Sequence, residues 1–365
     1  MELKELDIIN FKNIEQTTLR FSSGFNCFVG KNGMGKTNVL DAIYYLSMCK
    51  SCFNLPDLQN IRHREPFFVI QGKYLLEDEM VDIYCGVKRG QKKIFKKNQK
   101  SYSKLSEHIG LLPLVMISPE DSSLIDGGSE ERRRLVDGII SQCDSGYLQN
   151  LIRYNKALVQ RNSLLKMNAG RIIDLDSLEI WNDQLAEYGE KILRKRVEFL
   201  KEFREVFQMY YEELSLKRES VELGYKASVE SGGLLEALHD NIKKDCMLTY
   251  TTTGIHRDDL FLHIGGYPVK KIGSQGQKKT FLVALKLAQY DWLYRVGMVK
   301  PLLLLDDVFD KLDADRVRQI IRIVSGEIFG QIFITDTNRE HLDEILKEQQ
   351  VDYRLFYVDK GEINF

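Results

Sequence analysis

A glycine-rich loop near the start of the chain carries the clearest chemical signal. Residues 30–37 read Gly-Lys-Asn-Gly-Met-Gly-Lys-Thr, the Walker A pattern of a phosphate-binding loop. Its glycines let backbone N–H groups turn toward phosphate oxygens at a helix N-terminus. We expect the Lys36 ammonium to reach the β- and γ-phosphates of a nucleotide and the Thr37 hydroxyl to ligate Mg²⁺. The nucleotide-binding residues expected in this loop are Gly30, Lys31, Asn32, Gly33, Met34, Gly35, Lys36 and Thr37.

A second motif, an apolar run followed by acidic residues, resembles a Walker B strand. Residues 302–307 read Leu-Leu-Leu-Leu-Asp-Asp, an apolar run that ends in two carboxylates. Taken alone, such a run is often only the end of a strand. Together with a Walker A loop it predicts that Asp306 holds Mg²⁺, directly or through water. Asp307 would then orient or deprotonate the attacking water and act with Lys36 in catalysis.

A third motif stands between these two, immediately before a long helical pattern. Residues 273–277 read Gly-Ser-Gln-Gly-Gln. A helix start of this kind can bind an anion. The motif resembles the signature sequence of ABC ATPases, which in that superfamily contacts the γ-phosphate bound by the opposite subunit. The resemblance implies that Ser274, Gln275 and Gly276 complete the site of a second copy, so that two heads must meet.

The elements that position these motifs are α/β at both ends of the chain and helical in the middle. Strand-like runs precede the loop, residues 37–46 have helical spacing, and residues 301–305 and 331–335 are apolar strands. No proline occurs in residues 120–267, which favours helices. Ser129 is a candidate N-cap. Two helical faces are predicted, comprising Leu148, Leu151, Ile152, Leu158 and Leu165, and Leu185, Ile192, Leu193, Leu200, Phe203 and Phe207. We expect a head at residues 1–121 and 227–365, with a helical lobe inserted at residues 122–226.

Composition and charge exclude several classes of protein. The chain has 365 residues, 43% of them apolar and 29% charged, and a net charge of −1, so any nucleic acid must meet a local patch. The six cysteines do not form a disulfide framework, and Cys49-x-x-Cys52 lacks the second ligand pair that zinc would need. No stretch of about 18 apolar residues would span a membrane, and Met1–Glu5 lack a signal-peptide pattern. We expect a cytoplasmic protein without a membrane partner.

One strongly basic run is a candidate contact surface for DNA. Residues 88–100 contain seven cations and no acid, in what is predicted to be a β-hairpin. Such a run neutralises phosphates without regard to sequence, although lysines on a sheet edge also prevent aggregation. Arg132, Arg133 and Arg134 form a second cluster, in which we expect at least one structural ion pair. His256 and Arg257 are expected to support the fold. The DNA-binding residues predicted here are Lys92, Lys93, Lys96, Lys97, Arg132 and Arg133.

Six motifs, taken in order, resemble the RecF family of SMC-like ABC ATPases. They are the strand that ends in Asn10-Phe11-Lys12-Asn13, the phrase at residues 29–43, Ser118-Pro119-Glu120-Asp121, Arg132-Arg133-Arg134-x-x-Asp137, Thr253-Gly254-x-His256-Arg257-Asp258-Asp259 and Ser274-Gln275-Gly276-Gln277. The resemblance runs from residue 3 to about residue 337. It implies an ABC/SMC-type P-loop head with an inserted mainly helical lobe.

The resemblance also implies a function. It implies an ATP-dependent homodimer that binds double-stranded DNA near single-strand/double-strand junctions and loads RecA at gaps with RecO and RecR, in recombinational repair. It further implies a slow, DNA-stimulated ATPase, a choice of ATP over GTP, nucleotide contacts by Lys12 and Asn13, and a D-loop at Asp313. Lys12 replaces the Arg of many relatives, which keeps the charge but not a bidentate contact.

Three other kinds of ATPase remain as alternatives. A transporter subunit would carry a switch histidine after the strand at residues 331–335, where Asp336 and Thr337 stand instead. An SMC-like tether would need a much longer coiled coil. A nuclease of the ATPase-plus-acidic-domain type would need a further metal-binding domain, for which about 28 residues after Thr337 leave no room.

Overall fold

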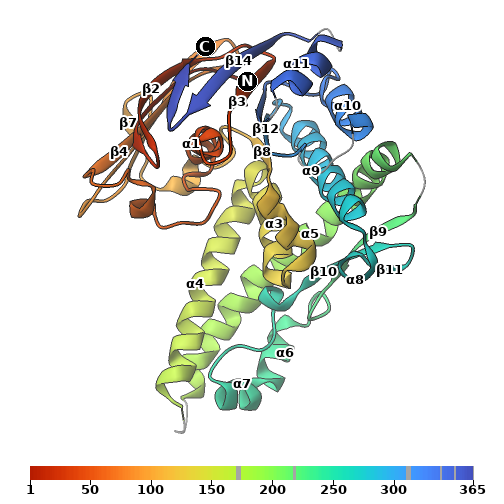
Figure 1. Cartoon of the computed structure of the whole chain (residues 1–365). Helices are drawn as coiled ribbons and strands as arrows, with labels where there is room; N and C mark the ends of the chain where they lie inside the picture. The colour runs from red at the N-terminus through yellow and green to blue at the C-terminus, as the bar shows by residue number, and fades with distance from the viewer. Residues whose placement is uncertain (170–173, 217–218, 310–313, 338, 349–350, 365) are drawn as a thin grey trace. The chain divides into compact units, whose positions relative to one another are not determined.

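A computed structural model describes residues 1–169, 174–216, 219–309, 314–337, 339–348 and 351–364 (Figure 1). The chain divides into two compact units. The first joins Met1–Asp121 to Val283–Phe365, and the second is Ser122–Leu282. In the described part of the chain, none of the helices combines the length and the apolarity needed to cross a bilayer.

A mainly parallel sheet forms the centre of the first unit. Its strand order is β15-β14-β3-β13-β12-β8, and only β15 (Glu362–Asn364) runs antiparallel to its neighbour. The expected strands are confirmed as β3 (Phe25–Val29), β12 (Leu302–Asp306) and β13 (Ile332–Asp336). Both β3 and β12 are buried throughout, including the polar side chains of Asn26 and Asp306, as is typical of parallel strands covered on both faces. The remaining strands are β8 (Leu114–Ile117) and β14 (Tyr353–Asp359).

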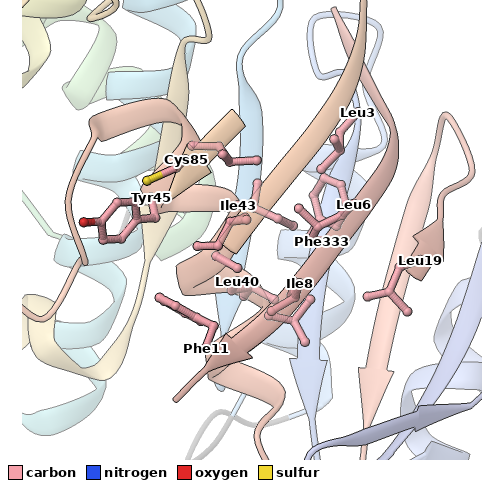
Figure 2. Packing of buried hydrophobic residues seen from close by; sticks show 14 of the residues in the cluster. Leu3, Leu6, Ile8, Phe11, Leu19, Leu40, Ile43, Tyr45, Cys85 and Phe333 are labelled. Carbon is pink, nitrogen blue, oxygen red and sulfur yellow. The ribbon is translucent and has the colours of Figure 1, made fainter. Parts of the chain in front are cut away.

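The P-loop helix packs under a second, antiparallel sheet in the same unit. This sheet has the order β2-β1-β4-β5-β6-β7, and its strands are β1 (Glu2–Phe11), β2 (Ile14–Arg20), β4 (Phe67–Leu76), β5 (Glu79–Lys88), β6 (Ile94–Lys97) and β7 (Lys100–Ser101). Figure 2 shows Leu6 and Ile8 of β1 against Leu40 and Ile43 of α1 (Lys36–Met48), all fully buried. Burial of side chains of this size contributes roughly 1.5–3 kcal/mol each. The helix that begins at the P-loop also contacts β8, β12 and β13, so it packs between the two sheets of this unit.

The basic hairpin predicted from the sequence is confirmed at one edge of the antiparallel sheet. Strand β5 turns at residues 89–93 and pairs antiparallel with β6, which pairs in turn with β7. The first unit is completed by α10 (Ala314–Val324) and α11 (Arg339–Glu348), and by the 3₁₀ helices η1 (Asp57–Asn60) and η2 (Leu105–Glu107).

The second unit is mainly helical, with a small sheet. Helices α4 (Ser145–Met167) and α5 (Leu175–Ser215) lie side by side in Figure 1. Strands β9 (Val221–Lys226), β10 (Asp259–Ile264) and β11 (Tyr267–Pro268) pair antiparallel. The other elements are α2 (Ser123–Asp126), α3 (Ser129–Cys143), α6 (Leu234–Asp240), α7 (Ile242–Leu248), η4 (Ile255–Arg257), α8 (Val269–Ile272) and the first turns of α9 (Gln275–Gly297). The 3₁₀ helix η3 (Pro119–Ser122) ends at the first residue of this unit.

The boundary of this unit differs from the lobe expected at residues 122–226. Both begin at the same residue, but the unit continues to Leu282. The reason is that β9, which ends at residue 226, pairs with β10 more than thirty residues later. Pairing between strands so far apart along the chain cannot be predicted from the local sequence pattern.

Two local predictions about the helices need correction and one is confirmed. The N-cap of α3 is Gly128 and not Ser129, which is already helical. On α4 the predicted face is confirmed at Leu165, whereas Leu148, Leu151 and Leu158 are half-buried and Ile152 is exposed. The buried face is formed by Tyr147, Tyr154, Ala157, Arg161 and Leu165. Polar side chains can be buried on that face because they form hydrogen bonds with other buried residues. The Arg161 guanidinium, for example, donates to Asp245 at 2.7 Å. All six residues predicted for the apolar face of α5 are buried.

Candidate functional site

The backbone of residues 30–37 has the conformation that only glycine adopts easily. Gly33 and Gly35 have φ angles of 80° and 113°, in the left-handed region. At Gly30 a Cβ atom would lie 2.2 Å from the carbonyl oxygen of Val358. The loop therefore closes tightly over the ends of β3 and β14, with its N–H groups available to an anion at the start of α1.

The Lys36 side chain lies inside this loop. It is only 4% exposed, and its Nζ donates to the carbonyl oxygens of Gly30 at 2.8 Å and Lys31 at 3.2 Å. A positive charge is thus held inside the curved backbone of the loop. Its contact with nucleotide phosphates stays a prediction.

The two predicted metal ligands lie in contact. The Thr37 hydroxyl donates to Oδ1 of Asp306 at 2.8 Å. Burial raises the pKa of Asp306, and the hydrogen bonds from Thr37 and Thr335 act in the opposite direction. Hydroxyl and carboxylate oxygens are the hard ligands that Mg²⁺ prefers, and a divalent cation would offset the cost of burying this carboxylate.

This donor set is small, as a nucleotide-bound Mg²⁺ requires. Among the described residues there is no cluster of three or more His, Cys, Asp or Glu side chains that could hold a metal unaided. Mg²⁺ at phosphate sites is usually held by one or two protein ligands together with phosphates and water. Thr37 and Asp306 fit that pattern.

The neighbouring carboxylate, Asp307, has an unusual backbone. Its φ angle is 46°, rare for a residue other than glycine and concentrated at functional sites. Its N–H donates to the hydroxyl of Thr335 at 2.9 Å. Thr335 was not among the sequence candidates, and its only signal is a polar residue at the end of the strand next to β12.

The turn between β1 and β2 reaches the P-loop through Asn13. Its Nδ2 donates to the carbonyl oxygen of Met34 at 3.0 Å, and its Oδ1 accepts from Nδ2 of Asn38 at 2.7 Å. The N–H of Gly361 also donates to the Met34 carbonyl, at 2.8 Å. These bonds hold the loop from outside. Asn13 is therefore placed to shape the loop, and Asn38 is a loop-supporting residue that the sequence did not single out.

Lys12 is paired within the same unit. Its Nζ lies 2.6 Å from Oδ2 of Asp41, a fully buried residue of α1. The same ammonium lies 4.2 Å from the centroid of the Phe53 ring. The Lys12 charge is thus balanced by a carboxylate that sequence reasoning missed. Its contact with the nucleotide stays a prediction.

A cavity of about 890 Å³ opens beside the N-terminal turn of α1. It is lined by Lys12, Asn38, Phe53, Leu55, Leu58, Gln59, Ile61, His63, Arg64 and Arg89. Four of the lining residues are apolar and six are polar or charged, and Lys12, Arg64 and Arg89 make the cavity positively charged. Through Asn38, the cavity adjoins the helix start that follows the phosphate-binding loop.

The predicted signature motif begins α9 in the second unit. The N–H of Ser274 donates to Oε1 of Gln277 at 2.7 Å, and the N–H of Gln277 donates back to Oγ of Ser274 at 3.2 Å. This reciprocal arrangement is a capping box. Ser274 and Gln275 are exposed and Gly276 is half-buried, so the helix start is accessible to solvent. Asp313, the predicted D-loop residue, lies outside the described residues.

The four lysines predicted to bind DNA differ in their surroundings. Lys92 is exposed, and Lys96 and Lys97 are half-buried on β6. Lys96 lies over the Tyr84 ring, 5.5 Å from its centroid. Lys93 instead donates to the carbonyl oxygen of Cys49 at 2.7 Å. Three of the four therefore present charge at the sheet edge, and the fourth is turned into the unit.

The predicted arginine cluster makes internal bonds in the second unit. Arg132 forms a two-pronged ion pair with Asp259, with distances of 2.8 and 3.0 Å. Arg133 donates to the carbonyl oxygen of Asp258 at 2.6 Å, and burial lowers the pKa of its guanidinium. The structural ion pair expected in this cluster is thus present at Arg132. A DNA contact by either arginine stays a prediction.

The run at residues 253–259 is a packing centre of the second unit. His256 bonds the Tyr154 hydroxyl at 2.8 Å, and burial lowers its pKa to about 4. Asp258 accepts from the N–H of Ser228 at 2.7 Å and lies 3.5 Å from Arg196. The supporting role expected for His256 is the one this geometry favours.

Fold and site together define a class of protein. A mainly parallel sheet carries a P-loop after β3 and an acidic strand end at β12, with β13 between the two strands. An antiparallel sheet covers the P-loop helix, and a helical unit carries the signature motif. This is the head of an ABC-type P-loop ATPase of the SMC kind. A family profile described as "RecF/RecN/SMC N terminal domain" matches residues 2–364.

Individual relatives narrow the class. The chain is 54% identical over 365 residues to the DNA replication and repair protein RecF of Bacteroides fragilis (strain YCH46), covering 100% of this chain and 98% of that one. It is 50% identical over 357 residues to the protein of the same name from Flavobacterium johnsoniae, covering 98% and 99%. The chain therefore belongs to the RecF family.

Solved structures agree with this assignment. The recombination mediator protein RecF-ATPrS of the RecFOR pathway is 32% identical, with a TM-score of 0.89 over 100% of this chain and 97% of that one. An Smc head bound to the C-winged helix domain of ScpA is 16% identical, with a TM-score of 0.59 over 100% and 96%. The second similarity concerns the fold alone.

Proposed function

We propose that this chain is an ATP-dependent DNA-binding protein of recombinational and replication-gap repair. It dimerises on ATP, binds double-stranded DNA near single-strand/double-strand junctions, and promotes RecA loading with RecO and RecR. The observation that carries the proposal is the convergence of Lys36, Thr37 and Asp306 at one helix start. The names of the relatives support the choice of ATP and of DNA repair.

The chain's own residues account for the chemistry. Lys36 and the loop N–H groups stabilise negative charge on the β- and γ-phosphates. Thr37 and Asp306 would hold Mg²⁺, which would supply positive charge beside the phosphates. Asp307 orients the attacking water or takes its proton. Because Asp336 stands in place of a switch histidine, turnover is slow, and hydrolysis acts as a switch.

Dimerisation follows from the division of the site between two motifs. The P-loop belongs to the first unit, and the accessible helix start at Ser274 belongs to the second. A helix N-terminus attracts phosphate through its N–H groups and its dipole. In the dimer, Ser274, Gln275 and Gly276 of one copy contact the γ-phosphate bound by the other.

The DNA surface is proposed at the basic hairpin. Lys92, Lys96 and Lys97 lie in the turn and on β6, next to the edge strand β7, with no acidic residue in the run. Their charge gives sequence-independent affinity for the phosphate backbone of DNA. This matches a protein that must recognise gaps wherever they occur.

The experiment compares the wild type with Lys36→Ala by light scattering and by a DNA mobility-shift assay, each with and without ATP. We expect ATP to double the mass of the wild type and to increase DNA retention, and Lys36→Ala to lose both responses. Lys104→Ala, an exposed lysine of the same unit, is the matched control and should behave as the wild type. Equal DNA binding with and without ATP in every protein would refute the mechanism.

A further inference from the structure

A buried threonine connects the two carboxylates of the proposed ATPase site. Thr335 lies near the end of β13 and pairs in register with Asp306 of the parallel strand β12. It is 0% exposed. Its hydroxyl donates to Oδ1 of Asp306 at 2.8 Å and accepts the N–H of Asp307 at 2.9 Å. One side chain therefore touches both acidic residues.

These bonds restrain each carboxylate in a different way. The hydroxyls of Thr37 and Thr335 converge on the same oxygen of Asp306, which limits rotation of that carboxylate. Asp307 has a backbone conformation that residues with a Cβ rarely adopt. The bond from its N–H to Thr335 stabilises that conformation and so sets the direction in which the Asp307 side chain leaves the strand.

The residue type is informative, because the rest of the strand before it is apolar. Residues 332–334 of β13 are Ile, Phe and Ile, all buried. Valine would fill the same space at position 335 but has no hydroxyl to donate or accept. Only a β-hydroxyl supplies a donor and acceptors at one atom.

We propose that Thr335 is a positioning residue for ATP hydrolysis. Its hydroxyl orients Asp306 toward the metal and Asp307 toward the attacking water. The inference rests on the proposed function, since it concerns the same site. Removal of a residue that orients a metal ligand typically lowers activity or metal affinity by about 10–100-fold. The loss should appear in kcat and in the Mg²⁺ dependence of nucleotide binding, and not in Mg²⁺-independent nucleotide binding.

The test uses paired variants of the full chain. Thr335→Val removes the hydroxyl and keeps the volume, and Thr335→Ser keeps the hydroxyl. Should Thr335→Val fail to fold, Thr335→Ala and Thr335→Ser still differ by the hydroxyl alone. Thr18→Val is the matched control, because it removes a threonine-to-carboxylate bond of 2.5 Å on the antiparallel sheet. The readouts are kcat, KM and the equilibrium binding of a fluorescent ATP analogue with and without Mg²⁺.

The expected result separates the hydroxyl from the packing. Thr335→Val and Thr335→Ala should lower kcat by about 10–100-fold and weaken Mg²⁺-dependent binding. Thr335→Ser and Thr18→Val should stay close to the wild type. Unchanged kcat in Thr335→Val, or equal defects in the Ser and Ala variants, would overturn the inference and leave the proposed function intact. A wild type that neither binds nor hydrolyses ATP would overturn both.

Discussion

The Lys93 ammonium lies 2.9 Å from a carboxylate oxygen of Asp57. The same Nζ donates to the carbonyl oxygen of Cys49, just past the end of α1, and lies 5.2 Å from the centroid of the Tyr45 ring. The side chain is 15% exposed. Lys93 therefore ties the turn of the basic hairpin to the far end of the helix that begins at the P-loop.

This ion pair predicts a stability effect at Lys93. Replacing Lys93 by Met leaves Asp57 and the Cys49 carbonyl without their cationic partner, so we expect the free energy of unfolding to fall by about 2 kcal/mol. Lys92→Met, at the exposed neighbouring position, should change it by less than about 0.5 kcal/mol. Urea denaturation of both variants measures the difference. Equal stabilities would mean that the Lys93 interactions contribute nothing.

Substitution of the other three lysines of the hairpin should change the affinity for DNA without unfolding the protein. Reversing the charge of Lys92, Lys96 and Lys97 to Glu, with Lys93 kept, should weaken DNA binding. The slope of log affinity against log salt should become shallower by roughly 0.9 for each phosphate that the protein no longer neutralises. DNA binding titrated at several salt concentrations gives that slope. The control is the affinity of the same variant for ATP, which should be unchanged; an unaltered salt slope would remove the hairpin from the DNA surface.

A buried histidine predicts how stability depends on pH. His108 is 0% exposed. One ring nitrogen lies 2.6 Å from the carbonyl oxygen of Leu46 in the last turns of α1, and the other 3.0 Å from the Tyr102 hydroxyl. Burial lowers the pKa of His108 to about 4. The unfolded chain, with a pKa near the usual ~6.5, therefore binds the proton first as the pH falls.

The consequence is a loss of stability between about pH 6.5 and pH 4. For His108 alone we expect a decrease of about 2 kcal/mol from about pH 7 to about pH 5. His108→Gln should be less stable at neutral pH but should lose correspondingly less on acidification. His63→Gln, at an exposed position, should keep the wild-type pH dependence. Urea denaturation at the two pH values measures both quantities; an unchanged pH dependence in His108→Gln would contradict the prediction.

The sequence predicted the features that depend on local order. Fixed spacing alone identifies the loop at residues 30–37, because a phosphate cradle needs its glycines, lysine and threonine in one contiguous run. The buried face of α5 and the apolar strands β3, β12 and β13 also follow from periodicity. Each of these is set by neighbours within a few residues along the chain.

The tertiary structure decided which residues interact with one another. Thr335 and Asp306 are 29 residues apart, Arg132 and Asp259 are 127 apart, and Lys93 and Cys49 are 44 apart. No periodic pattern encodes such pairs, because the sheet topology brings them together after the elements have formed. The sequence by itself thus identified the residues that we propose bind the phosphate. Only the folded chain decided which side chains position those residues and which of the basic residues form internal bonds. The physical reason is that a buried charge needs a partner, and the fold determines which residues lie near enough to provide one.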